Sequence, residues 1–305
     1  MMGYETGVHA PGLRGRGFVA ARHALLAHAA AAAEFGGLVP GGRLSVNVNG
    51  DWAEPWDAAD PADVAAAERS LDLGLHLFGD PLFTGQWPAS VLAAAPPGAH
   101  PFSPAESAAL RAAAPSYFAL NFYTAAYVRD APGAVDPGTG AVGGFLRAQA
   151  TGPASAPIGA LAESTWLYKT PWAMRSMLTH VASRYGVPIV VTENGCSAPG
   201  EGAGKSKKAA LNDDWRVDYY RRYLDAATDA VNDDGVPLRR YFAWSLLDNF
   251  EWADGYGALF GVTHVDFEDQ TRLTRTLKAS GRYLSQRFAP GAAVSKGGGG
   301  GPAAA

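Results

Sequence analysis

The feature of this sequence that most limits its fold is a regular alternation of β-rich runs with helical segments. Four runs have the composition of strands: residues 44–49, 117–123, 187–192 and 240–246. Segments with helical character follow or precede them: residues 23–35, 62–78, 171–185, 215–232 and 277–288. Because strands that alternate with helices form βα units around a parallel sheet, the pattern predicts an α/β fold with four parallel strands, not eight.

Glycine and proline mark the expected ends and loops. Gly79-Asp80-Pro81 is expected to close the second helix, and Pro171 and Gly186 to begin and end the third. The Gly- and Pro-rich residues 131–157 are expected to form a loop.

Composition excludes several classes of protein. The 305 residues are 48% hydrophobic, which is enough for one large core or two ordinary domains. Lys and Arg number 25 against 29 Asp and Glu, so we expect neither nucleic acid nor an acidic membrane surface as a partner. A single cysteine rules out a disulfide framework and a cysteine-based zinc cluster, and nothing in the sequence suggests another metal or a cofactor.

The two ends of the chain carry little information. Residues 1–5 show no secretory signal, and no run of 18 apolar residues occurs, so the cytoplasm is the default expectation. Residues 289–305 are rich in Gly and Ala and are predicted to be a disordered tail after one domain at 1–288.

The sharpest local signal is a continuous apolar run, Val187–Val191, which ends at Thr192-Glu193-Asn194-Gly195. In α/β barrels the C-terminal ends of the strands carry the active site, so Glu193 is a candidate catalytic carboxylate. A glutamate that only caps the next loop fits the spacing equally well.

The second signal is the segment 241–252, in which Trp244 and Trp252 flank Asp248, Asn249 and Glu251. Flat aromatic faces and carboxylates are the groups that bind a sugar ring and its hydroxyls. The alternative is that the aromatic rings belong to the core and the acids cap a helix.

These segments together resemble the family 1 glycoside hydrolases, the β-glucosidase family. The resemblance runs from about Gly3 to Phe288, and the matching segments are Gly3–Gly7, Ala10–Gly12, His28-Ala29, Asp80–Phe83, Leu120–Thr124, Thr192–Gly195, Trp244–Trp252, Gly255-Tyr256, Phe260-Gly261 and Val265–Phe267. It implies a (β/α)8 barrel that hydrolyses O-glycosyl bonds of β-D-glycosides with retention.

The resemblance also implies roles for particular residues. Glu193 would be the nucleophile, and Tyr123 would orient it. The remaining contacts implied are Asn121 beside the nucleophile, Glu251 and Trp252 at the sugar hydroxyls, Trp244 under the ring and Phe260 in the pocket wall.

The residue that serves as the general acid in this family has no counterpart in this sequence. It belongs to an Asn-Glu-Pro motif that ends the fourth strand, before the segment matched by Gly3-Tyr4, and this sequence has no such motif. We therefore expect the C-terminal half of the barrel, with four βα units and the N-terminal half missing, and a truncated or fragmentary β-glucosidase-like enzyme. Glu54 precedes a proline but lacks the Asn and follows the fifth strand in order, so we do not expect it to be the acid.

Two other hypotheses remain open beside the enzyme. One is a catalytically inactive sugar-binding relic that lacks the acid. The other is an interaction module, because a half barrel exposes two strand edges through which the chain could associate with itself.

Four further features are expected to have no catalytic role. His23 and His28 are expected to pack on a helix rather than bind a ligand. Cys196 is expected to be a loop thiol, with the lining of an outer pocket as the alternative, and Lys205–Lys208 a solvated basic loop. Leu259, where the family usually has Arg, removes only a local ion pair.

Overall fold

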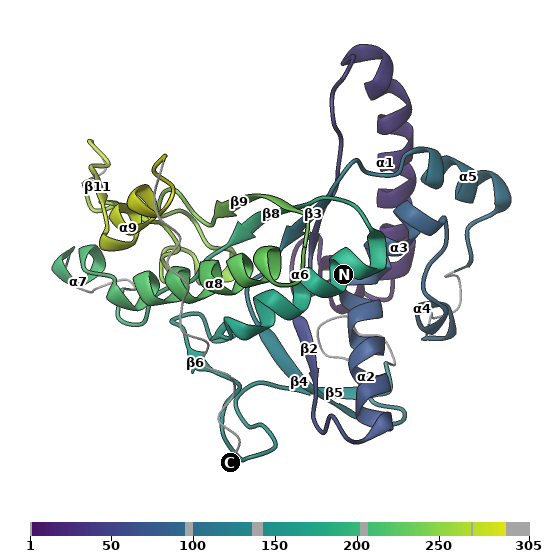
Figure 1. Cartoon of the computed structure of the whole chain (residues 1–305), viewed down its shortest axis with the longest axis horizontal. Coiled ribbons are helices and arrows are strands. Elements are labelled where there is room, and N and C mark those ends of the chain that lie inside the picture. The colour runs from purple at the N-terminus through teal and green to yellow at the C-terminus, as the bar shows by residue number, and fades with distance from the viewer. Residues whose placement is uncertain (1, 95–99, 136–142, 202–206, 270, 291–305) are drawn as a thin grey trace.

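The computed structural model describes residues 2–94, 100–135, 143–201, 207–269 and 271–290 (Figure 1). Its helices are α1 (Gly17–Leu38), α2 (Pro61–Leu71), α3 (Leu77–Thr84), α4 (Ala89–Ala94), α5 (Pro104–Ala112), α6 (Trp172–Tyr185), α7 (Lys207–Leu211), α8 (Asp214–Asn232) and α9 (Ala279–Arg287), with short helical turns at η1 (Met2–Thr6), η2 (Asp72–His76) and η3 (Trp252–Asp254). Its strands are β1 (Asn47–Asn49), β2 (Trp52–Pro55), β3 (Phe118–Asn121), β4 (Ala125–Asp130), β5 (Phe145–Ala148), β6 (Ala160–Leu161), β7 (Tyr168–Lys169), β8 (Ile189–Asn194), β9 (Leu238–Ala243), β10 (Thr263–Val265) and β11 (Arg275–Leu277). Most of the expected tail, from residue 291 on, lies outside the described residues.

The central element is a four-stranded sheet in the order β1-β3-β8-β9, in which every pair of neighbours is parallel. These are the four strands that the alternation of apolar runs predicts, and the α/β class is confirmed. The strand order follows the chain order. Because the strands are parallel, all four C-terminal ends lie at one edge of the sheet. In the described part of the chain, β1 and β9 each have one strand neighbour.

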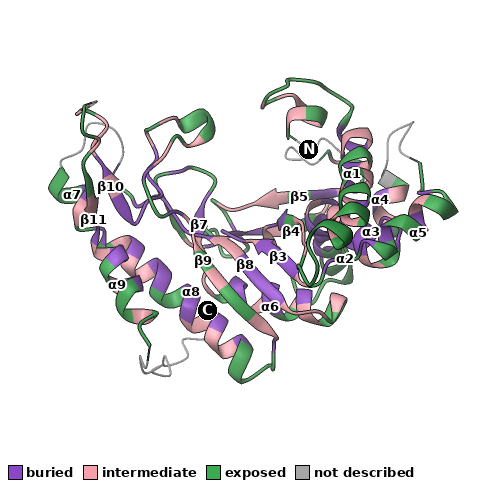
Figure 2. Cartoon of the chain, turned by 90° about the horizontal axis from the view of Figure 1, so that it is seen from above, coloured by how far each residue is buried: buried purple, intermediate pink, exposed green. Residues whose placement is uncertain are grey.

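Helices α6 and α8 pack together along one face of this sheet (Figures 1 and 2). Helix α6 has Pro171 as its N-cap residue and ends at Gly186 with a φ of 65°, as the sequence predicts. The apolar layer between the helices and the sheet is formed by buried side chains of Leu120, Met174, Met177, Ile189, Val191, Tyr219 and Tyr223. None of the helices described has the length and apolar character needed to cross a bilayer.

A second sheet has the order β2-β4-β5. Its strands β2 and β4 directly follow β1 and β3 in the chain. The prediction of a loop at 131–157 was wrong in part, because β5 lies inside it and pairs antiparallel with β4. A buried ring and contacts from helix α2 hold β5 in this pairing. Phe145 is buried, and Arg69 of α2 bonds both Asp130 and the carbonyl of Gly144.

The second helical segment does not end at Gly79-Asp80-Pro81, so that prediction was also wrong. The chain continues through η2 and α3 to Thr84, and Gly85 ends the helix with a φ of 83°. Asp80 is buried and forms an ion pair with Arg184 of α6, with the two side chains 2.6 Å apart. This tertiary contact outweighs the local signal of the proline.

Candidate active site

Glu193 and Tyr123 meet at the C-terminal ends of β8 and β3. The hydroxyl of Tyr123 donates a hydrogen bond of 2.5 Å to Oε2 of Glu193. A register shift after Leu120 places Asn121 opposite Glu193. Burial, together with the bond to Glu193 and its charge, raises the pKa of Tyr123 far above its usual value. The phenol therefore stays protonated and acts as a fixed donor to the carboxylate.

The peptide that carries Tyr123 is fixed by helix α8. The hydroxyls of Tyr219 and Tyr223 both donate to the carbonyl of Tyr123, each at 3.0 Å. Asn194, the residue after Glu193, donates from Nδ2 to the carbonyl of Phe122 at 2.7 Å. Two strand ends and one helix thus hold the Glu193–Tyr123 pair in one geometry.

Asn121 is also joined to the strand that carries Glu193. The hydroxyl of Thr192 donates to Oδ1 of Asn121 at 2.6 Å. Asn121 is half-buried, so part of its side chain remains accessible beside Glu193.

Glu251 is the second carboxylate of the site. Its pKa is raised to about 7, first by burial and then by the charges of Asp254 and Glu193. The same Glu251 charge contributes to the raised pKa of Tyr123. The charge of Glu193 thus acts on Glu251, and the charge of Glu251 acts on Tyr123. Carboxyl groups with a raised pKa are common at functional sites.

Aromatic rings border the Glu193–Tyr123 pair. Phe260 is buried and meets Tyr123 edge-on, with ring centroids 6.3 Å apart. Trp166 stacks on Phe260 at 6.4 Å and meets Tyr123 edge-on at 5.7 Å, yet it remains 42% exposed. Sequence reasoning missed Trp166, since no spacing pattern links this residue, which lies between β6 and β7, to Glu193.

The two tryptophans singled out in the sequence occupy different surroundings. Trp244 follows β9, is half-buried and donates from its backbone N–H to the carbonyl of Asn194 at 2.8 Å. Trp252 is 74% exposed, and its ring meets that of His9 edge-on at 5.8 Å. Trp244 is therefore joined to the strand of Glu193, whereas Trp252 packs against the N-terminal segment.

Glu54 lies inside β2, not past the end of a strand as the sequence suggested. Its Oε2 accepts a hydrogen bond of 2.7 Å from the indole of Trp52. Strand β2 pairs with β4 of the second sheet, so Glu54 is held in a different sheet from Glu193.

The two histidines on α1 differ from each other. His23 is exposed, so the prediction that it packs was wrong, because the buried stripe of α1 runs along Phe18, Ala21, Leu25 and Ala29. His28 is half-buried, and its Nε2 lies 3.1 Å from the carbonyl of Ala113.

Cys196 is fully buried, so it does not line an outer pocket, and burial raises the pKa of its thiol well above the usual value. Lys207 and Lys208 are exposed as expected but belong to α7, while Lys205 lies outside the described residues. Leu259 is buried, and its carbonyl accepts a hydrogen bond from Arg216.

Gly195 marks the closest approach in the site. A Cβ on this residue would lie 1.7 Å from the carbonyl oxygen of Trp244, which is backbone and has little room to move. We expect Gly195→Ala to lower the free energy of unfolding by about 1–3 kcal/mol through this overlap, as measured by urea denaturation. Gly36→Ala is the matched control. It lies on α1 with open space around it, and we expect it to be neutral or slightly stabilising.

Comparison with known proteins adds to this geometry. The sequence profile described as Glycosyl hydrolase family 1 matches residues 1–289. The chain is 38% identical over 248 residues to beta-glucosidase 1B of Phanerodontia chrysosporium, covering 81% of this chain and 44% of that protein. It is 34% identical to beta-glucosidase 42 of Arabidopsis thaliana, covering 97% and 61%.

Solved structures give the same result. Beta-glucosidase 2 from the fungus Trichoderma reesei, in complex with Tris, superposes with a TM-score of 0.87 at 37% identity, covering 94% of this chain and 62% of that one. A β-glucosidase from the fungus Humicola insolens, in complex with glucose, superposes equally well at 33% identity, with the same coverage. The chain thus spans between about two fifths and three fifths of the length of these relatives.

Proposed function

Since this chain belongs to glycosyl hydrolase family 1, we propose that it is a retaining β-glycosidase of the β-glucosidase type. The observation that carries the proposal is the hydrogen bond between Tyr123 and Glu193 at the C-terminal ends of adjacent parallel strands. The β-glucosidases that it resembles, one of them in complex with glucose, support a β-glycoside as substrate.

In the proposed mechanism Glu193 is the nucleophile. Tyr123 binds one carboxylate oxygen and so directs the other toward the anomeric carbon. Attack forms a covalent glycosyl–enzyme, and the bond to the leaving group breaks as the new bond forms. Water then hydrolyses the intermediate and releases the sugar with its configuration retained.

The other site residues bind the sugar in this proposal. Glu251 and Trp252 contact its hydroxyls, Asn121 lies beside the nucleophile, Trp244 lies under the ring, and Phe260 forms the pocket wall. Trp166, stacked on Phe260 and partly exposed, is placed to contact the leaving group.

The proton for the leaving group has no donor with the family's motif, because the sequence contains no Asn-Glu-Pro tripeptide. General acid catalysis contributes about 10²–10⁴-fold, mainly for leaving groups that need a proton. The proposal therefore favours activated glucosides over cellobiose for this chain. We further infer that its four βα units represent one half of an eight-stranded barrel.

A second candidate function is sugar binding without hydrolysis. It is favoured by one observation: the rings of Phe260 and Trp166 border the Glu193–Tyr123 pair, whereas the sequence has no Asn-Glu-Pro motif to supply the general acid. The two candidates differ in whether a covalent bond to Glu193 forms.

The test is therefore to trap that bond. 2-Deoxy-2-fluoro-β-glucosyl fluoride needs no general acid, because fluoride leaves unaided, and its fluorine at C2 slows hydrolysis of the intermediate. We expect mass spectrometry to show one added fluoroglucosyl group on the peptide that contains Glu193, in the parent chain and equally in Glu54→Gln. If calorimetry shows binding of glucose and no labelling occurs, the sugar-binding candidate is established instead. If the chain shows neither labelling nor binding, both candidates are overturned.

We also propose that a second copy of the chain covers the open side of the sheet. Edge strand β9 and the residues after it carry Phe242, Leu246 and Phe250, which are 51%, 71% and 64% exposed. Exposed apolar side chains beside a strand edge that has no partner among the described strands favour association. We expect light scattering to show dimers or larger species, and Phe242→Lys to shift them toward monomer. A parent chain that is monomeric at every concentration tested would contradict this.

A further inference from the structure

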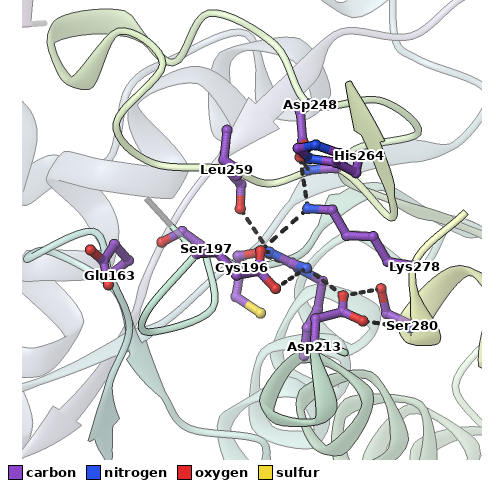
Figure 3. A network of polar contacts seen from close by, with 12 residues as sticks. Glu163, Cys196, Ser197, Asp213, Asp248, Leu259, His264, Lys278 and Ser280 are labelled. Carbon is purple, nitrogen blue, oxygen red and sulfur yellow. Dashed lines mark hydrogen bonds and ion pairs between the residues drawn. The ribbon is translucent and has the colours of Figure 1, made fainter. Parts of the chain in front are cut away.

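A cluster of buried charges lies where α8 meets the loops that follow β8 and β9 (Figure 3). We call it the Arg216 cluster, and its members are Arg216, Lys278, Glu201, Asp213 and Asp248. The side chains of both cations are fully buried, and those of the three acids are at most 3% exposed. His264 borders the cluster, with Nδ1 3.3 Å from Asp248.

Arg216 uses all five of its N–H groups in this cluster. Two form a pair of bonds to the carboxylate of Glu201, at 2.9 and 2.5 Å, and one binds Asp213. The other two reach backbone: Nε donates to the carbonyl of Cys196 at 2.9 Å, and Nη2 to that of Leu259 at 2.7 Å. A planar guanidinium can hold four acceptors in such a fixed arrangement, whereas an ammonium group cannot.

The two carbonyls belong to the two segments that build the site. Cys196 lies three residues after Glu193, and Leu259 immediately precedes Phe260, whose ring packs against Tyr123. One buried side chain therefore connects the segment of the nucleophile with the segment of the pocket wall.

A second connection fixes both ends of the loop that carries Glu251. Asp248, just before this loop, accepts from the backbone N–H of Gly261, just after it, at 3.0 Å. Lys278 donates to Asp248 at 2.8 Å and to Glu201 at 3.2 Å, which ties the loop to Arg216. A Cβ on Gly261 would lie 2.1 Å from the backbone nitrogen of Asp248, so the loop ends are in close contact.

We propose that Arg216 is a positioning residue, which holds the Glu251–Phe260 loop against the strand end of Glu193 and so sets the arrangement of the two carboxyl groups. This role rests on the proposed function, since it matters for catalysis only if Glu193 is the nucleophile. Buried ion clusters contribute little net stability compared with apolar residues of the same size, so stability alone does not account for this one.

The test uses variants of the whole chain. Arg216→Met alone would leave the buried cluster with one more net negative charge, so the main variant is Arg216→Met with Glu201→Gln, which removes one positive and one negative charge together. Arg216→Lys keeps the charge and loses the fork. Arg222→Met is the matched control, because Arg222 lies exposed on the same helix and pairs only with Asp218 in the contacts described.

Two measurements follow. The first is turnover of dinitrophenyl β-glucoside, for which we expect kcat to fall about 100-fold in the double variant and in Arg216→Lys, with Arg222→Met unchanged. The second is the pKa of Glu251 by ¹³C NMR of labelled glutamate, which is about 7 in the parent and is expected to move toward 4.5 once the loop is released. Circular dichroism establishes that each variant is folded.

The outcomes separate the two proposals. A folded double variant with unchanged kcat and an unchanged Glu251 pKa would overturn the positioning role, as would an Arg216→Lys variant that behaves like the parent. A parent chain without turnover would count against the proposed function, while the pKa of Glu251 would still decide whether Arg216 holds the loop.

Discussion

Glu193→Gln is expected to lower the turnover of dinitrophenyl β-glucoside by about 10⁴–10⁶-fold, which is the scale seen when a catalytic nucleophile is removed. The amide that replaces the carboxylate is a poor nucleophile and cannot form the glycosyl–enzyme. The bond from Tyr123 needs only an oxygen acceptor at this position, so the geometry should survive the change. Release of dinitrophenolate measures the loss.

Two further variants and an added nucleophile test the assignment of Glu193. Tyr123→Phe removes the bond to Glu193 and keeps the ring, so we expect a smaller loss of about 10²-fold. Glu54→Gln should change little, since that carboxylate bonds Trp52 in another sheet. Added azide should speed turnover by the parent, because it attacks the glycosyl–enzyme in place of water without needing a general base, and the sugar leaves Glu193 as glycosyl azide. Turnover that depends on Glu54 and not on Glu193 would reverse the assignment.

The second large effect concerns stability in acid, and it arises from His76. Its Nε2 lies 2.8 Å from Nε2 of His180, and its Nδ1 lies 2.7 Å from the hydroxyl of Tyr185. Burial, then the charge of Arg184 and the proximity of His180, lowers the pKa of His76 to about 2. The pKa of His180 is lowered too, first by burial. Asp80, 3.9 Å from His76, does not offset this because Arg184 already pairs with it.

The sign of the effect follows from proton binding. Between about pH 6.5 and pH 2 the unfolded chain protonates His76 and the folded chain does not, so stability falls as the pH falls through this range. At pH 5 the expected loss relative to pH 7 is about 2 kcal/mol for this residue.

The measurement is urea unfolding of the parent and of His76→Gln at a series of pH values. Glutamine keeps hydrogen-bonding groups and does not titrate, so the variant should lose less stability on acidification than the parent by about that amount. The comparison with a variant is needed because Glu251, whose pKa is raised, acts in the opposite direction between pH 4.5 and 7. His23→Gln, on the exposed side of α1, is the control and should follow the parent. Parallel curves for the parent and His76→Gln would contradict the prediction.

The four strands of the central sheet and the longer helices could be predicted because their signals are local. Val187–Val191 is a continuous apolar run, and Pro171 and Gly186 mark the two ends of α6. The pairing of Asp80 with Arg184 could not be predicted in this way. The two residues are 104 positions apart, and only the fold shows that their contact overrides Pro81.

The residues of the candidate site differ in the same way, because only some of them have a local signal in the sequence. Glu193 follows the apolar run Val187–Val191 and belongs to the segment Thr192–Gly195, so the local sequence is enough to identify it. Arg216 has no such neighbourhood, since its acceptors lie at positions as far apart as Cys196 and Leu259. Trp166 likewise becomes visible only when Phe260 is seen to stack on it.

The long connections within the site also bear on how the chain is made. Tyr123 and Glu193 are 70 residues apart, and the hydroxyls that hold the carbonyl of Tyr123 come from 96 and 100 residues downstream. At ribosomal rates of about 5–20 residues per second, α8 follows β3 by about 5–20 s. The apolar strand β3 lacks its partner β8 during the first part of that interval, and it lacks its covering helix throughout. Yield in a recombinant host should therefore depend on growth temperature and on chaperones that shield nascent strands, more than on the stability of the finished molecule.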